Sequence, residues 1–147
     1  MNSKDDELAK AIGKKMLDSD NASRSLGIEI EDVRTGYARL SMVISNTHTN
    51  GHRVAHGGLI FTLADSAFAL ACNSYNQNAL AQHCTITFTA PGQLGDILAA
   101  EAIERHSAGR SGIYDVRVTN QNSHLIAEFR GNSRTIEGQH FPDEARN

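Results

Sequence analysis

Apolar and polar residues repeat along this chain with the spacing of two helices and six strands. Apolar residues recur at helical intervals between Ser3 and about Leu17, which predicts a first helix whose start Ser3 and Asp6 would cap. Apolar and polar positions alternate in six other segments, as in strands that bury one face: 28–33, 38–42, 79–89, 97–105, 113–119 and 125–129. The polar segment 45–56 is predicted to be a loop, because it is rich in histidine and interrupted by Gly51.

The second helix is predicted to begin at Gly57-Gly58 and to end near Asn73. Its sequence is apolar on nearly every side, which is typical of a helix that the rest of the fold encloses. At about 100° per residue, its polar exceptions fall on one narrow stripe, which we expect to face a cleft. They are Thr62, Asp65, Ser66 and Asn73.

This order of elements predicts an α+β fold in which an antiparallel sheet wraps around one central helix. The chain of 147 residues is long enough for one domain with a substantial core. Residues 1–25 would form an N-terminal helix and lead-in, and residues 26–136 the domain itself. Residues 137–147, which are polar and contain Pro142, are expected to form a loose tail.

Composition narrows the environment and the partners. The net charge is −3 and no basic cluster occurs, so nucleic acid is not an expected partner. The first residues are charged and no apolar run follows them, so no signal peptide and no membrane span are expected. Cys72 and Cys84 are interpreted as buried free thiols in a reducing cytoplasm, and a disulfide between them is the alternative.

Asp65 is the main candidate for chemistry, because a carboxylate on a buried helix is costly unless it is paired or faces a wet cleft. The Gly57-Gly58 pair offers a complementary group. The first N–H groups of a helix are unpaired and carry partial positive charge, and glycine lets a ligand approach them closely. Such a helix start can hold a carbonyl oxygen that gains negative charge.

Gly57 and Asp65 are separated by eight positions, which is about 12 Å along a helix axis. One helix cannot readily present both to the same reacting atom. Two antiparallel copies of the helix can, with the glycine end of one beside the aspartate of the other. The sequence therefore predicts an active site that belongs to a dimer.

Three stretches of the chain carry a resemblance to a known family. They read NGHRVAHGGLIFTLADSAFALACNS from Asn50, ALAQHCTITFTAPGQLGD from Ala79, and GIYDVRVTNQ with the later FRGNS. In order and spacing these segments resemble the hotdog-fold acyl-CoA thioesterases of the phenylacetate-pathway (PaaI) type. The resemblance spans about 26–136. It implies the hotdog fold, hydrolysis of acyl-CoA without metal or organic cofactor, and a homotetramer built from dimers.

The resemblance also implies residue roles. Asp65 matches the catalytic carboxylate, either general base or nucleophile, and Gly57 matches the N–H that polarises the thioester carbonyl. Asn50 and His56 match polar residues that shape the site. In related enzymes a hydroxyl on the following strand helps to hold the water, but residues 81–84 offer no such group in this sequence. Substrate contacts are expected from three further residues, which are Gly58, Thr62 and Ser66.

Other interpretations of these residues remain open. Asp65 could form an ion pair across an interface. The spacing of His48, His52 and His56 could suggest a metal site, but no carboxylate or cysteine completes a ligand set, so no metal is expected. A serine or cysteine nucleophile is disfavoured, because no G-x-S-x-G turn occurs and Cys72 lies among apolar residues.

Arg110 and Arg130 lie beside glycines and are candidates for binding the phosphates of coenzyme A, with ordinary surface charge as the alternative. The predicted function is hydrolysis of phenylacetyl-CoA or hydroxyphenylacetyl-CoA by a cytoplasmic homo-oligomer. A hotdog protein that binds acyl-CoA without hydrolysing it is the alternative. A hydratase is disfavoured because the Asp-x4-His spacing of that branch is missing.

Overall fold

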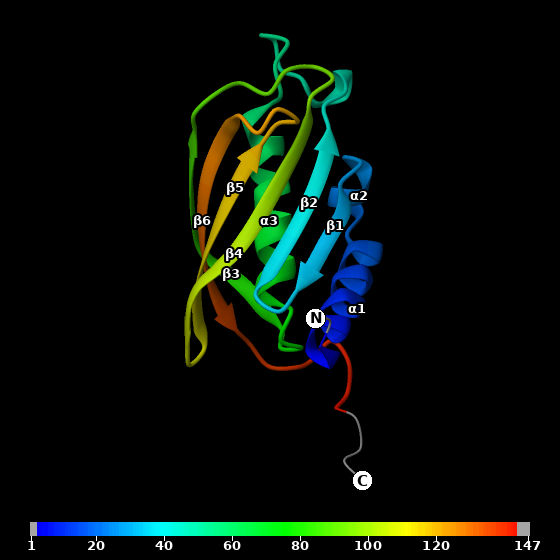
Figure 1. Cartoon of the computed structure of the whole chain (residues 1–147), viewed down its shortest axis with the longest axis vertical. Helices are drawn as coiled ribbons and strands as arrows, with labels where there is room; N and C mark the ends of the chain where they lie inside the picture. The colour runs from blue at the N-terminus through cyan, green and yellow to red at the C-terminus, as the bar shows by residue number, and fades with distance from the viewer. Residues whose placement is uncertain (1–2, 144–147) are drawn as a thin grey trace.

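Figure 1 shows one curved antiparallel sheet wrapped around a central helix, α3, in a computed structural model that describes residues 3–143. Three helices and six strands make up this part of the chain, with one 3₁₀ turn (η1, Asn46–His48) before α3. The helices are α1 (Lys4–Ser19), α2 (Asn21–Ser25) and α3 (Gly57–Cys72). The strands are β1 (Glu29–Arg34), β2 (Tyr37–Val43), β3 (Ala79–Phe88), β4 (Ile97–Ala108), β5 (Ser111–Thr119) and β6 (Leu125–Thr135).

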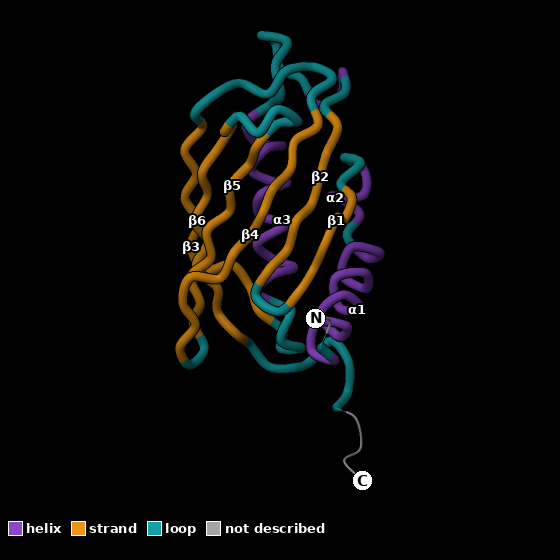
Figure 2. Tube along the Cα trace, viewed as in Figure 1, coloured by secondary structure: helices purple, strands orange, loops and turns teal. Residues whose placement is uncertain are grey.

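The sheet has the order β1-β2-β4-β5-β6-β3, and every neighbouring pair is antiparallel. All six strands and both long helices predicted from the sequence are present, so the expected α+β hotdog architecture is confirmed. α1 lies beside β1 at one edge of the sheet (Figure 2). β3 forms the other edge and pairs only with β6 among the described strands, which leaves one side of a ten-residue strand open.

The core lies between α3 and the concave face of the sheet. Small side chains occupy several inner positions of the strands and leave room for the helix; they are Ala38, Ala100, Ala102 and Ala127. Phe68 projects from α3 against Tyr114 and Phe129, with ring centroids 5.6 and 5.9 Å apart. A Cβ on Gly131 would lie 2.8 Å from the Phe68 ring, so this strand position accommodates the ring only as glycine. Packing against the sheet therefore explains why most side chains of α3 are apolar.

The N-terminal helix begins as predicted, with the Ser3 hydroxyl accepting the N–H of Asp6 at 3.1 Å. The Asp6 carboxylate itself accepts from the N–H and the hydroxyl of Thr35, at 3.0 and 2.7 Å, and so ties α1 to the β1–β2 turn. The sequence did not predict the short helix α2. Asp20 caps it by accepting the N–H of Ser23 at 3.0 Å.

The expectation of a loose tail is wrong for its described part, residues 137–143. Asn76 exchanges hydrogen bonds with the backbone of Phe141, at 2.9 and 3.0 Å, and the N–H of Asn78 donates to the carbonyl of Gly138 at 3.0 Å. Asparagines of the α3–β3 connection thus hold the backbone of residues 137–143. The sequence of this polar segment shows neither helical nor strand periodicity. Residues 144–147 of the expected tail lie outside the described residues.

No helix within residues 3–143 combines the length and the apolar character needed to cross a membrane. The outer face of the sheet carries ion pairs between neighbouring strands, including Arg39 with Glu31 at 2.6 Å and Arg117 with Glu128 at 2.8 Å. This face is therefore polar, and the apolar face is the one that holds α3.

Candidate active site

Gly57 is the first residue of α3, and its N–H has no hydrogen-bond partner among residues 3–143. The neighbouring Gly58 N–H donates to Nδ1 of His56 at 3.0 Å and is already committed. A Cβ on Gly57 would lie 3.2 Å from the Phe88 ring, which crosses the helix start closely. A pocket of about 380 Å³ opens here, lined by Ala55, Gly57, Ile60 and residues 88–91. Of the two glycines, Gly57 is the one with a free donor for a ligand oxygen.

His56 anchors the loop to the helix, as the sequence suggested. Its side chain caps α3, and its own N–H donates to the carbonyl of His48 at 2.8 Å. His48 is buried, and its Nδ1 accepts the N–H of Ser45 at 3.0 Å. No pattern in the sequence predicted this second anchor. No group of three metal-ligating side chains occurs in the described part of the chain, so the three histidines of the loop form no metal site there.

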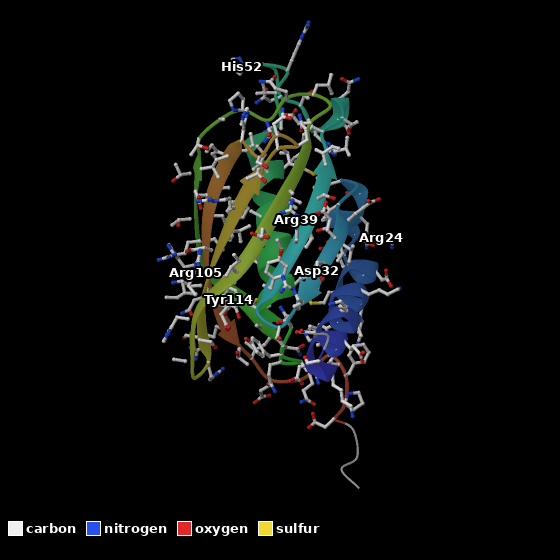
Figure 3. The ribbon with its side chains drawn as sticks, in the orientation of Figure 1. Arg24, Asp32, Arg39, His52, Arg105 and Tyr114 are labelled. Carbon is white, nitrogen blue, oxygen red and sulfur yellow. The ribbon has the colours of Figure 1, made fainter. Side chains whose placement is uncertain are left out.

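Asn50 organises the turn of the same loop. Its Oδ1 accepts the N–H of His52 at 2.9 Å, and its own N–H donates to the carbonyl of Val54 at 2.9 Å. Arg53 takes a positive φ of 62°, which this tight turn requires. Figure 3 shows His52 at the tip of the loop, away from the sheet. Asn50 thus shapes the segment that leads into Gly57.

Asp65 lies halfway along α3 on a stripe that the rest of the chain leaves partly open. Gly58 is exposed, and Thr62, Asp65 and Ala69 are half-buried. The expectation that the helix is enclosed on every side is therefore wrong for one chain. The stripe runs beside β3, the strand with the open edge.

No hydrogen bond or ion pair reaches the Asp65 carboxylate from the described residues. Burial raises the pKa of Asp65 above its usual value, and the negative charge of Asp20 raises it further. A structural ion pair between Asp65 and another residue of 3–143 is thereby excluded. A half-buried carboxylate with a raised pKa has the properties that general acid–base chemistry uses.

Asp20 is a functional candidate that the sequence did not suggest. Its carboxylate accepts from the Ser23 hydroxyl at 2.6 Å, and that hydroxyl is 2.8 Å from the Ser66 hydroxyl, one residue beyond Asp65. This chain of contacts joins the N-terminal lead-in to the middle of α3. Its only sequence signal is an aspartate at a helix start, which is common and not specific to function.

Two residues of the predicted polar stripe have other partners in the structure. Ser66 is buried against Ser23 and does not share the open stripe, a correction of the single polar stripe predicted from the sequence. Asn73, at the end of α3, is also buried and bonds Ala79 of β3. Thr62 does lie on the open stripe, and its hydroxyl donates to the carbonyl of Gly58 at 3.0 Å.

A second pocket, of about 410 Å³, lies beside Asp65. Its walls come from the second half of α3, the start of β3, α1 and the segment after β6. The residues are Met16, Asp65, Phe68, Ala69, Cys72, Asn73, Asn78, Ala79, Leu80, Ala81, Ile136 and His140. This pocket contains Asp65 without Gly57, and the pocket at the helix start contains Gly57 without Asp65. One chain therefore does not bring the two groups together.

The two arginines are placed differently. Arg130 forms a two-point ion pair with Asp115 on the outer face of the sheet, at 2.6 and 2.9 Å, and Arg105 joins it at 3.1 Å. The Arg130 guanidinium is exposed and paired with Asp115, which favours the alternative of ordinary surface charge for this residue. Arg110 is exposed in the β4–β5 hairpin, where its Nε donates to the carbonyl of Thr135 at 3.1 Å. That hairpin and the loop before Gly57 lie at opposite ends of the sheet (Figure 1).

The cysteines are both free, and only Cys72 is fully buried. Burial raises the pKa of Cys72 to about 12, so its thiol stays protonated at neutral pH and is a poor nucleophile. Cys84, in β3, is half-exposed, and burial followed by the charge of Asp65 raises its pKa. A bulge between Ala81 and His83 shifts the register of β3 just before Cys84.

Comparison with known proteins places this geometry in a family. The family model described as the thioesterase superfamily matches residues 52–127. Acyl-coenzyme A thioesterase PaaI of Escherichia coli K12 is 43% identical over 123 residues, which cover 84% of this chain and 88% of that protein. The structure of the E. coli PaaI protein, from its phenylacetic acid degradation operon, superposes with a TM-score of 0.89 at 40% identity, over 91% of this chain and 97% of that one.

A Streptococcus mutans protein solved with bound acetyl-CoA superposes with a TM-score of 0.73 at 25% identity, over 76% of this chain and 90% of that one. The family match covers the loop, the helix start, Asp65 and most of the sheet. The resemblance found in the sequence is thus confirmed: this chain belongs to the thioesterase superfamily and has its hotdog fold.

Proposed function

We propose that the protein hydrolyses acyl-CoA thioesters to a free acid and coenzyme A. The observation that carries the proposal is Asp65, a half-buried carboxylate with a raised pKa and no partner within the described chain. As general base, Asp65 takes a proton from water as the water oxygen attacks the thioester carbonyl, and passes this proton to the coenzyme A sulfur as the C–S bond breaks. As nucleophile, Asp65 attacks that carbon itself, coenzyme A leaves as the thiolate, and water then hydrolyses the acyl–aspartyl anhydride to the free acid and the Asp65 carboxylate. In both routes the carbonyl oxygen gains charge at the N–H of Gly57.

The proposed site is shared by two copies of the chain. β3 offers a long open edge with Leu80 and Phe88 exposed, which a monomer would be expected to protect. Antiparallel pairing of two such edges places the open stripes of two α3 helices side by side. Gly57 of one copy then lies near Asp65 of the other, and Arg110, at the opposite end of the sheet from Gly57, becomes a candidate for the phosphates of coenzyme A. A tetramer of two such dimers is the assembly that we propose.

The acyl group is proposed to be compact and aromatic, as in phenylacetyl-CoA or its hydroxylated relatives. The pocket beside Asp65 follows α3 from Asp65 to Asn73, which is about 12 Å at the helical rise per residue. The hydrocarbon core of a lipid bilayer is about 30 Å thick and is spanned by two acyl chains end to end. One long acyl chain therefore needs about 15 Å. The pocket length therefore favours a phenyl ring over a long alkyl chain. The phenylacetic acid degradation operon of the E. coli relative supports the same choice.

Replacement of Asp65 by Asn keeps the shape of the side chain and removes its charge. We expect kcat for acyl-CoA hydrolysis, followed by release of free thiol, to fall at least about a hundredfold, because a general base contributes in this range. Because burial disfavours the charged carboxylate, Tm at pH 7 should rise. The exposed Asp18→Asn variant is the control and should match the parent. An Asp65→Asn variant with parental kcat would show that Asp65 is not the catalytic carboxylate.

Replacement of Gly57 by Pro removes the N–H at the start of α3 that has no partner among residues 3–143. The change suits the first position of a helix, and His56 already has the extended conformation that precedes proline (φ −63°, ψ 130°). We expect a loss of about a hundredfold to a thousandfold in kcat, which is typical for one oxyanion donor, while Gly57→Ala, which keeps the N–H, should lose less.

Mixing the two inactive proteins tests whether the site is shared. Dimers of one Gly57→Pro chain and one Asp65→Asn chain contain one intact site, so dissociation and reassociation of the mixture should restore hydrolysis. If each site used both residues of one chain, every site in the mixture would be defective and no activity would return.

The pH dependence of kcat/KM reports the environment of Asp65. Because its pKa is raised in the folded protein, activity should fall with decreasing pH at a higher pH than for an ordinary aspartate. Asp20→Asn removes the nearby charge but keeps a side chain able to cap α2, so the acidic limb should move to lower pH. Asp18→Asn should leave the limb in place. An unchanged limb in Asp20→Asn would remove Asp20 from the site.

Specificity constants test the acyl group. We expect kcat/KM for phenylacetyl-CoA or hydroxyphenylacetyl-CoA to exceed that for palmitoyl-CoA by more than about tenfold, which corresponds to about 1.4 kcal/mol. A preference for palmitoyl-CoA would refute the compact pocket and leave the thioesterase proposal intact.

A further inference from the structure

The segment 137–143, here called the C-terminal strap, crosses the end of the Asp65 pocket. It follows β6 directly and passes along the α3–β3 connection to the side of α1. Among its residues, His140 contributes to the pocket wall, opposite the start of β3. The pocket thus extends from Asp65, in the middle of α3, to His140, which is far from Asp65 in the sequence.

Around His140 and Phe141, the strap has three hydrogen-bonding partners. Nε2 of His140 donates to Oδ1 of Asn73 at 2.8 Å, the backbone of Phe141 pairs with the Asn76 side chain at 2.9 and 3.0 Å, and Lys15 of α1 bonds the carbonyl of His140. The Lys15 ammonium also lies 4.6 Å from the centre of the Phe141 ring. These contacts come from both α1 and the end of α3, so the position of His140 is fixed from two sides.

Asn73 is a rigid support for His140. It is buried, its Nδ2 donates to the carbonyls of Ala69 and Ala79 at 2.8 and 3.1 Å, and its Oδ1 also accepts the N–H of Ala79 at 3.0 Å. Burial, and then the Lys15 charge, lower the pKa of His140, so the ring is neutral at pH 7. A neutral, fixed imidazole is a suitable end wall for an apolar acyl group.

We propose that His140 of the C-terminal strap closes the far end of the Asp65 pocket and sets the largest acyl group that the enzyme accepts. This inference rests on the proposed thioesterase function. His140 is a specificity-determining residue in this role and takes no part in the bond-breaking step. The strap would thus exclude long acyl chains by occupying the space into which they would extend.

Substitution of His140 by a smaller residue tests the proposal. We expect His140→Ala to raise the ratio of kcat/KM for decanoyl-CoA to that for phenylacetyl-CoA by about tenfold or more, the effect of burying two further methylene groups. His140→Asn, which is smaller but polar, should change the ratio in the same direction. If the alanine variant does not fold, the ratio measured for His140→Asn tests the proposal. Tm of each variant shows whether the fold is retained.

Two controls separate pocket size from general damage. His140→Gln has a similar reach and keeps an N–H donor for Asn73, so the parental ratio is expected. His106→Ala removes an exposed histidine of β4, away from the pocket, and should also keep the parental ratio. A parental ratio in folded His140→Ala or His140→Asn would overturn the end-wall role while hydrolysis continued. If the parental protein released no thiol from any acyl-CoA, the proposed function itself would fail.

Discussion

The structure depends on a conflict within α3, which must be apolar enough to fill the concave face of the sheet and yet carries a carboxylate at its centre. Burial against the strands fixes the helix through Phe68 and a row of small inner side chains. The same burial withdraws Asp65 from water and raises its pKa. A residue that costs stability and has no structural partner is most simply explained by chemistry.

The geometry of one helix also explains why the proposed site needs two chains. The free N–H of Gly57 and the Asp65 carboxylate are fixed on a rigid element, about 12 Å apart, and they open into different pockets. No side-chain movement can bring them to one carbonyl carbon. The open edge of β3 and the half-buried stripe of α3 lie next to each other, so one association would cover both and complete the site.

The two ends of the chain contribute to this site as well. The lead-in places Asp20 close enough to influence Asp65, through contacts that pass by Ser23 and Ser66. The C-terminal strap places His140 at the other end of the pocket. In the proposed site, the central sheet and helix supply the reacting groups, while segments outside them adjust the basicity of the carboxylate and the size of the pocket. Such a division would let the acyl specificity change without disturbing the core.

Local patterns in the sequence determined the architecture and the two reacting groups. Alternation and helical periodicity record which side of each element is buried, so all six strands, α1, α3 and the Ser3 cap were predictable. An acid in an apolar helix and a glycine pair at its start were equally visible. Only the tertiary structure decided that Ser66 faces Ser23, that Asp115 holds Arg130, and that the tail is fastened through Asn73 and Asn76. The two residues of each contact are separated by between 15 and 67 positions in the sequence. A local periodicity does not specify which distant polar group a side chain will contact.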